Sequence, residues 1–216
     1  MAFGIDAWYE SRVDQAREEE YQRRIAFELG GLRDTIERMY RSTVHASDVA
    51  VDVTREFYSS HEPDDPDRIV TALYNVGRDH LAPLDMSNYE DLVSTGSVAL
   101  ISDLDRRQAI QRAYANVALV EQSREPHRDE YLTGVRGWIP QEFIDEIQTT
   151  CPDISAEGWE CPAIDFDDVV VQTIVRRAST DEAFLAFQLR RQGLDVQRRR
   201  IERAISAIDE ALAYFE

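Results

Sequence analysis

The chain has 216 residues, of which 43% are hydrophobic, a share that is ordinary for a folded protein and excludes a wholly disordered chain. It carries 42 acidic residues against 24 basic ones, all of them arginine, for a net charge of −18. Such a surface repels nucleic-acid phosphates and anionic lipid heads, and the absence of lysine excludes Schiff-base chemistry and a P-loop. No stretch approaches the roughly 18 consecutive apolar residues of a membrane span, and no signal peptide is recognisable.

The first 60 residues carry the periodicity of one helix face, with apolar residues every three or four positions. They are Tyr21, Ile25, Leu29, Leu32, Ile36 and Tyr40. The pattern weakens further on, so either one very long helix covers about residues 6–60, or two helices meet near residues 42–47. Gly30 and Gly31 fall inside the pattern and mark either a bend or close packing.

The middle of the chain contains four shorter helical patterns, opened by a proline turn or by a serine followed three residues later by an acid. They cover about residues 66–80, 87–96, 102–124 and 140–147. We expect Ser87 and Ser102 to cap the second and third of these helices. Gly96 is placed to close the second in a left-handed conformation.

The two cysteines, Cys151 and Cys161, flank a short stretch that contains Gly158 and is typical of a loop. A loop of this length can bring two cysteines within disulfide distance, whereas a zinc site lacks further ligands. We expect a disulfide, which implies an oxidising compartment, with two free thiols as the alternative.

The last 50 residues begin ambiguously and end with the clearest helix in the chain. Residues 165–177 fit a strand or a helix, and we favour the helix. Residues 179–182 form a capping-box pattern, and apolar residues then recur every seven positions. They are Phe187, Leu194, Ile201, Ile208 and Phe215. Only the N-terminal helix is long enough to cover this stripe, which predicts that the two pack antiparallel.

The sequence therefore predicts an all-α fold, an elongated helical bundle in which shorter helices lie between long N-terminal and C-terminal helices. We expect a single domain, residues 1–216. Its parts are a long N-terminal helix region (1–61), an acidic helical middle (62–150), a cysteine loop (151–164) and the C-terminal helices (165–216).

Charge is distributed unevenly along the chain. Residues 62–168 carry 23 acids and 8 arginines, a balance of −15, while the two ends are nearly balanced. The middle is therefore the predicted negative pole. Two interpretations stay open, a surface for a basic partner or cations and a solvated surface that only keeps the protein soluble.

Residues that could carry chemistry are few. None of the four histidines lies in a Glu-x-x-His or H-E-x-x-H pattern. His80 adjoins Asp79, and His127 lies close to Asp129 and Glu130, but acids are frequent enough here for chance neighbours. No catalytic, cofactor-binding or metal-binding residue is assigned, and no cofactor is expected.

A basic cluster lies within residues 190–203, where Arg191, Arg198 and Arg203 would flank the apolar stripe and the other arginines would point outward. It fits nucleic-acid or phosphate binding, solvation, or pairing with acids of the N-terminal helix such as Glu18–Glu20.

The segment Tyr89–Asp103 reads Y-E-D-L-V-S-T-G-S-V-A-L-I-S-D, and it resembles the Y-x-x-L-x-x-x-G-x-x-x-x-I-x-D signature of an uncharacterised family of bacterial single-pass membrane proteins. Residues 4–12 resemble the point where that family's membrane helix continues into a long soluble helix, and residues 180–184 the start of its closing helix. The resemblance implies an N-terminal anchor, which this chain lacks, and no known activity. We expect structural roles for Tyr89, Leu92, Gly96, Ile101 and Asp103.

Together these patterns favour a non-enzymatic helical interaction or scaffold domain, anchored to a bacterial inner membrane and facing the extracytoplasmic side. A cytoplasmic location is the alternative. We expect a protein partner at the acidic middle, no nucleic acid, and membrane contact only through the anchor, and we leave homo-oligomerisation open. The competing hypothesis is a hydrolase or metal-dependent enzyme with a site assembled from scattered histidines and aspartates.

Overall fold

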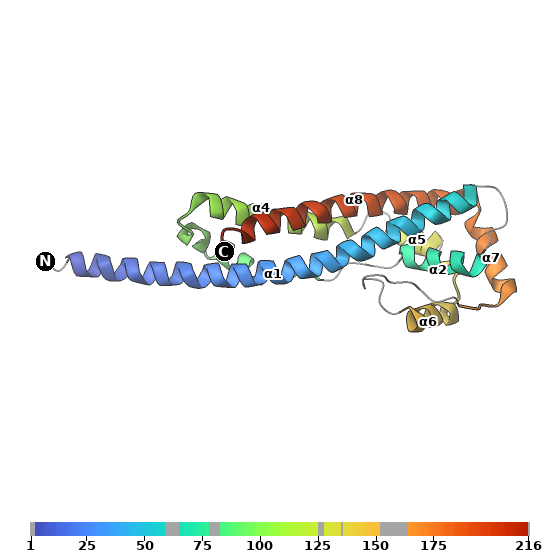
Figure 1. Ribbon diagram of the computed structural model, residues 1–216, viewed down its shortest axis with the longest axis horizontal. Helices are drawn as coiled ribbons and strands as arrows, with labels where there is room; N and C mark the ends of the chain where they lie inside the picture. The colour runs from blue at the N-terminus through green and yellow to red at the C-terminus, as the bar shows by residue number, and fades with distance from the viewer. Residues whose placement is uncertain are drawn as a thin grey trace. The chain divides into compact units, whose positions relative to one another are not determined.

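The computed structural model describes residues 3–58, 65–77, 83–124, 128–134, 136–151 and 164–215. All regular secondary structure in these ranges is helical, which confirms the predicted all-α fold (Figure 1). The chain forms two compact units. Unit 1 comprises Met1–Glu37, Pro83–Glu121 and Ile201–Glu216, and unit 2 comprises Arg38–Ala82 and Gln122–Arg200. The single domain over residues 1–216 stays a prediction.

The N-terminal region is one continuous helix, α1 (Phe3–Tyr58), and not two helices that meet near residue 45. Gly30 and Gly31 lie in its interior, and a Cβ built on either would meet no other atom within 4 Å. These glycines therefore do not serve close packing.

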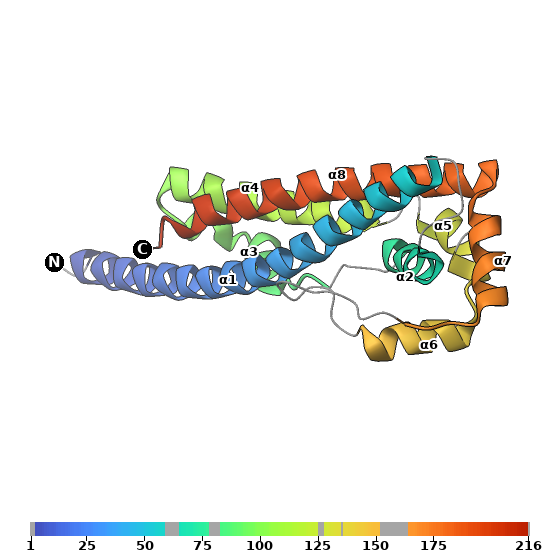
Figure 2. The same ribbon diagram turned by 45° about the vertical axis from the view of Figure 1, so that its right-hand side comes forward.

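The C-terminal helix, α8 (Asp181–Leu212), packs antiparallel to α1 in each unit, as predicted (Figures 1 and 2). In unit 1 the Arg33 Nε donates to Asp209 Oδ1 at 2.8 Å, and in unit 2 the Ser47 Oγ donates to Asp195 Oδ1 at 3.0 Å. The predicted stripe on α8 is buried at Phe187, Leu194, Ile201 and Ile208, each at most 3% exposed.

Unit 1 is completed by α3 (Ser87–Ser94), the 3-10 turn η1 (Ser97–Leu100) and α4 (Leu104–Glu121). Buried positions on α4 recur every three or four residues, which presents one apolar face to the interior. They are Ala109, Ile110, Ala113, Tyr114, Val117 and Val120. An ion pair between Arg112 and Glu210, 3.0 Å apart, joins α4 to α8.

Unit 2 is built around α2 (Pro66–Gly77), whose residues from Ile69 to Gly77 are buried except at Thr71. A helix that is buried on almost every side needs neighbours all around it. They include α5 (Arg128–Gly134), α6 (Gln141–Thr150) and α7 (Asp168–Ala178) (Figure 2). The short turn η2 (Gln122–Arg124) precedes α5, and η3 (Arg136–Trp138) lies between α5 and α6. The helix at α7 confirms our preference for helix over strand.

Polar side chains fix the C-terminal part of α2 in place. The Arg190 Nε donates to the Val76 carbonyl at 3.1 Å, and the Tyr131 hydroxyl donates to the Leu73 carbonyl at 2.7 Å. Val76 lies in the last turn, whose carbonyls have no partner within the helix, and Leu73 lies just before that turn. A Cβ on Gly77 would come within 2.9 Å of the Tyr131 ring, so this close approach requires glycine. The expectation that Arg190 points outward is wrong, because its side chain is buried to serve α2.

The predicted serine caps are wrong in detail. Ser87 is the first residue of α3, and its own N–H donates to Asp85 Oδ1 at 3.0 Å. At α4 the capping side chain is Asp103, which accepts from the N–H groups of Asp105 and Arg106 at 2.9 and 3.1 Å, whereas Ser102 bonds elsewhere. At both helices carboxylates take the role in place of serine, because they make charge-assisted bonds with the first turn.

The long α8 begins one residue later than the capping-box pattern implies. Thr180 precedes its first residue and accepts from the Ala183 N–H at 3.4 Å, while Ser179 ends α7. The helix thus starts from threonine rather than serine.

Candidate functional site

The most connected polar group described in unit 1 is Glu28 of α1, which is only 7% exposed. Its carboxylate accepts from the N–H and the side-chain amide of Asn88, at 2.7 and 2.9 Å, and from the N–H of Tyr89 at 3.3 Å. The Tyr114 hydroxyl of α4 donates to the same carboxylate. One side chain of α1 thus supplies the cap of α3 and a hydrogen bond to α4.

The two tyrosines beside Glu28 form a stacked pair. The rings of Tyr89 and Tyr114 are 4.0 Å apart at their centroids and lie 4° from parallel. Burial raises the pKa of both hydroxyls above 10, and at Tyr114 the neighbouring Glu28 adds to the rise. These hydroxyls keep their protons, so Tyr114 serves as a hydrogen-bond donor and not as a base.

A second carboxylate of α1 acts in the same way. Glu18 accepts from both the N–H and the hydroxyl of Ser102, each at 2.9 Å, at the entrance to α4. The roles of Glu18 and Glu28 could not be predicted from the sequence. Their partners lie 60 to 86 residues further along the chain, so no local pattern marks them.

The five motif residues of Tyr89–Asp103 all lie in unit 1. Leu92 and Ile101 are each 1% exposed and belong to the core. Gly96 has φ of 70° and ends the turn after α3 in the left-handed conformation, and Asp103 caps α4. Tyr89 takes part in the stacked pair. In the structure the motif forms α3, the turn that follows it and the cap of α4, and carboxylates of α1 bond to this segment.

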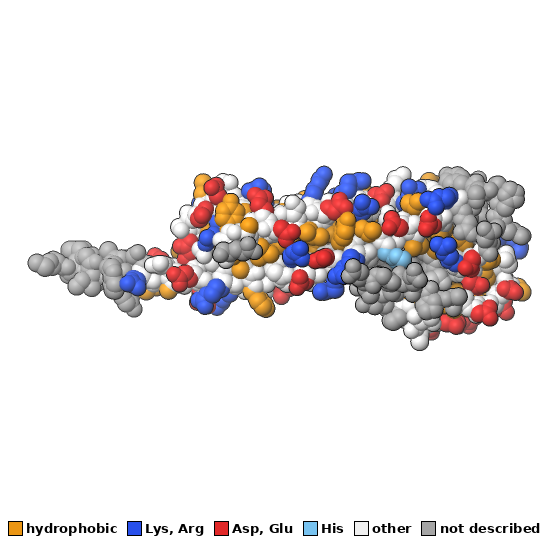
Figure 3. Space-filling model, viewed as in Figure 1, with side chains coloured by type: hydrophobic (Ala, Val, Ile, Leu, Met, Phe, Trp, Pro, Cys, Tyr) orange, Lys and Arg blue, Asp and Glu red, His pale blue; other side chains and the backbone are white. Residues whose placement is uncertain are grey.

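An acidic surface lies on unit 2, on α6 and the segment that leads into α7. The exposed carboxylates that define it are Glu142, Asp145, Glu146, Asp165 and Asp168. Figure 3 shows acidic side chains gathered over this part of the molecule. The two elements are joined by the stacked rings of Phe143 and Phe166, 4.3 Å apart.

Asp67, at the start of α2, lies beside this surface, and its pKa is sensitive to the negative charges there. Burial raises the pKa of its carboxyl above 3.8, and Asp65, Asp165 and Asp168 raise it further, against a lowering hydrogen bond from the Phe166 backbone. Several negative charges therefore lie close enough to repel one another.

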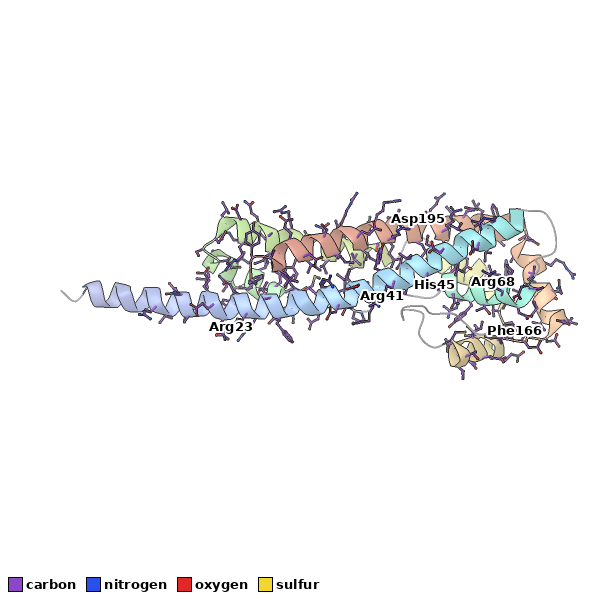
Figure 4. All side chains as sticks on the ribbon, viewed as in Figure 1. Arg23, Arg41, His45, Arg68, Phe166 and Asp195 are labelled. Carbon is purple, nitrogen blue, oxygen red and sulfur yellow. The ribbon has the colours of Figure 1, made fainter. Side chains whose placement is uncertain are left out.

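The histidine and cysteine predictions fall largely outside the described residues. His61, His80, His127 and Cys161 are among the positions that the structure does not describe. Cys151 is fully buried, and its bond to Cys161 stays a prediction. His45 is half-buried on α1 (Figure 4), and burial lowers its pKa below 6.5 against an opposing effect of Asp48.

Among the described residues, no group of three or more histidine, cysteine, aspartate or glutamate side chains is arranged to hold a metal ion. No helix in the described ranges combines the length and apolar character that a bilayer crossing requires. A scan against models of known protein families finds no match, and searches of curated proteins and of solved structures find no similar protein.

Proposed function

We propose that the protein is a non-enzymatic helical scaffold domain that binds a basic protein partner through the acidic surface of α6 and α7. The observation that carries the proposal is that buried polar groups of the protein bond to other helices. Glu28 bonds to the start of α3, Arg190 to the last turn of α2, and Tyr131 to the Leu73 carbonyl of α2. These bonds fix helices and leave the groups unavailable to a substrate.

The acidic surface supports the choice of partner. Burial is the main cause of the raised pKa of Asp67, and Asp65, Asp165 and Asp168 raise it further, so the carboxylates around the start of α7 repel one another. A cationic partner relieves that repulsion. The balance of −15 in residues 62–168 adds a long-range attraction that speeds encounter with positive proteins.

A titration with a short arginine-rich peptide tests the surface directly. The double variant Glu142→Gln/Glu146→Gln should bind the peptide about three to tenfold more weakly than the parent at low salt. The control Asp48→Asn/Glu182→Gln removes the same charge from exposed positions of unit 2 outside the surface and should change binding little. Equal losses in the two variants would mean that the peptide senses only net charge, which contradicts a defined surface.

We propose further that an N-terminal membrane anchor presents this domain on the extracytoplasmic side. The resemblance of residues 4–12 and 89–103 to the anchored family supports this proposal. Alkaline carbonate extraction of membranes from the native host tests it. Retention of the protein in the membrane pellet is expected, and complete release into the supernatant would contradict the anchor.

The enzyme hypothesis, a hydrolase or metal-dependent site built from scattered histidines and aspartates, stays an untested alternative. Three of the four histidines lie outside the described residues, and no described contact favours it.

A further inference from the structure

Unit 1 contains a cavity of about 350 Å³ beside the C-terminal end of α8. It is lined by Arg23 and its neighbours on α1, by Arg106 in the first turn of α4, and by Tyr214 and Phe215, which follow α8. Figure 4 labels Arg23 on α1. The volume falls in the range of small-molecule sites, which is about 300 to 1,000 Å³.

Arg106 is the first sign that this cavity takes a ligand. Its guanidinium carbon lies 5.5 Å from the centroid of the Phe215 ring, so the group is held over an aromatic face. Its Nε is buried and has no hydrogen-bond partner among the described residues. A buried charged donor without an acceptor is costly, and an acceptor entering the cavity would remove that cost.

Arg23 adds a second positive charge to the lining. Its Nε donates to the Glu19 carbonyl at 3.3 Å, and no described carboxylate pairs with its guanidinium. By contrast, Arg24, Arg33 and Arg112 of the same unit each pair with an acid. The lining therefore brings together two arginines that pair with no described carboxylate.

We propose that this cavity binds a small organic carboxylate that carries a flat apolar group. The planar guanidinium forks match the two oxygens of a carboxylate, and the rings of Tyr214 and Phe215 offer an apolar face. Glu19 also lines the cavity, and its negative charge opposes a dianion such as phosphate more strongly than a monocarboxylate. The site lies outside the acidic surface and does not rest on the proposed function.

The probe that tests the cavity is benzoate, with the N–H signals of the arginine Nε atoms followed by nuclear magnetic resonance. We expect the Arg106 signal to shift and saturate with a dissociation constant on the order of 1 mM, as a ligand of this size allows. Acetate and inorganic phosphate should bind more weakly, and benzamide, which has the same ring without the charge, should not saturate. Equal binding of benzamide, or no saturation by benzoate up to about tenfold above that constant, would overturn the proposal.

Two variants locate the binding, and a third controls for charge. Arg106→Gln and Arg23→Gln should each weaken benzoate binding, by about tenfold at Arg106, because each removes a charged donor. Arg24→Gln removes the same charge one residue away, at an exposed position paired with Glu20, and should bind benzoate like the parent. Loss of binding in Arg24→Gln as large as in Arg23→Gln would contradict the site. If Arg106→Gln does not fold, the comparison of Arg23→Gln with Arg24→Gln decides.

Discussion

At the scale of single residues, polar side chains of unit 1 fix the positions of helices by hydrogen bonds to their ends. Glu28 bonds to the first N–H groups of α3 and to a tyrosine of α4, and Glu18 bonds to the entrance of α4. In unit 2, Arg190 plays the opposite part at the end of α2 by donating to an unpaired carbonyl. Negative groups thus lie at helix starts and a positive group at a helix end, as the helix dipole favours.

The substitution Glu28→Gln tests this role. Its amide nitrogen would face donors where a carboxylate oxygen now accepts, so we expect a loss of about 2–3 kcal/mol in the free energy of unfolding. Urea denaturation measures the loss. The control Glu20→Gln removes an exposed carboxylate that pairs only within α1, and should change stability by less than about 0.5 kcal/mol. Similar free energies of unfolding for the two variants would show that the Glu28 carboxylate does not stabilise the fold.

The burial of His45 predicts that the stability of the fold depends on pH. Because burial lowers its pKa in the folded state, the unfolded chain binds the proton more readily. Its contribution to stability is therefore complete above its unfolded pKa of 6.5 and is lost as the pH falls below that value. We expect His45→Gln to lose less stability than the parent between about pH 7.5 and about pH 5.5. Parallel losses in urea denaturation at the two pH values would refute this assignment.

At the scale of helices, local periodicity predicts most of the structure. The stripes of α1 and α8 predict the long helices and their antiparallel pairing, because a three-or-four spacing depends only on neighbouring residues. The caps could not be predicted in the same way. Ser87 looks like a cap in the sequence, but Glu28, 60 residues away, takes the α3 donors once the chain folds.

Glycine substitutions distinguish a glycine that a left-handed turn requires from one that only weakens a helix. Gly96 has φ of 70°, so Gly96→Ala should cost about 1–2 kcal/mol by forcing a side chain into the left-handed region. Gly31 lies in the interior of α1 with open space around it, so Gly31→Ala should gain about 0.5–1 kcal/mol. Thermal denaturation of both variants checks the signs. A stabilising Gly96→Ala would contradict the left-handed turn.

The α1–α8 seam in unit 1 is tested by Ile201→Asp. Ile201 is fully buried, so an aspartate there would be an unpaired charge in the seam and should cost about 3–5 kcal/mol. The control Val196→Asp changes a position on α8 that is 40% exposed and should cost less than about 1 kcal/mol. Equal denaturation midpoints for Ile201→Asp and the parent would rule out the seam.

At the scale of the whole molecule, the sequence predicts where charge accumulates but not what it contacts. The −15 balance of residues 62–168 is visible by counting. The acidic surface of α6 and the start of α7 depends on the stacking of Phe143 and Phe166, which brings two separate segments together. The cavity at Arg106 is also invisible in the sequence, because α1, α4 and the residues after α8 meet only in the folded unit.

The central claim, a scaffold that binds a basic partner at the acidic surface, is tested most directly by site-specific photo-cross-linking in the native host. A photoreactive residue at Asp145, between Glu142 and Glu146 on α6, should yield one discrete adduct whose cross-linked peptide is rich in arginine or lysine. The adduct should fade when Glu142→Gln/Glu146→Gln is added and persist with Asp48→Asn/Glu182→Gln. An adduct that does not depend on the α6 carboxylates, or the absence of any adduct at Asp145, would contradict the claim.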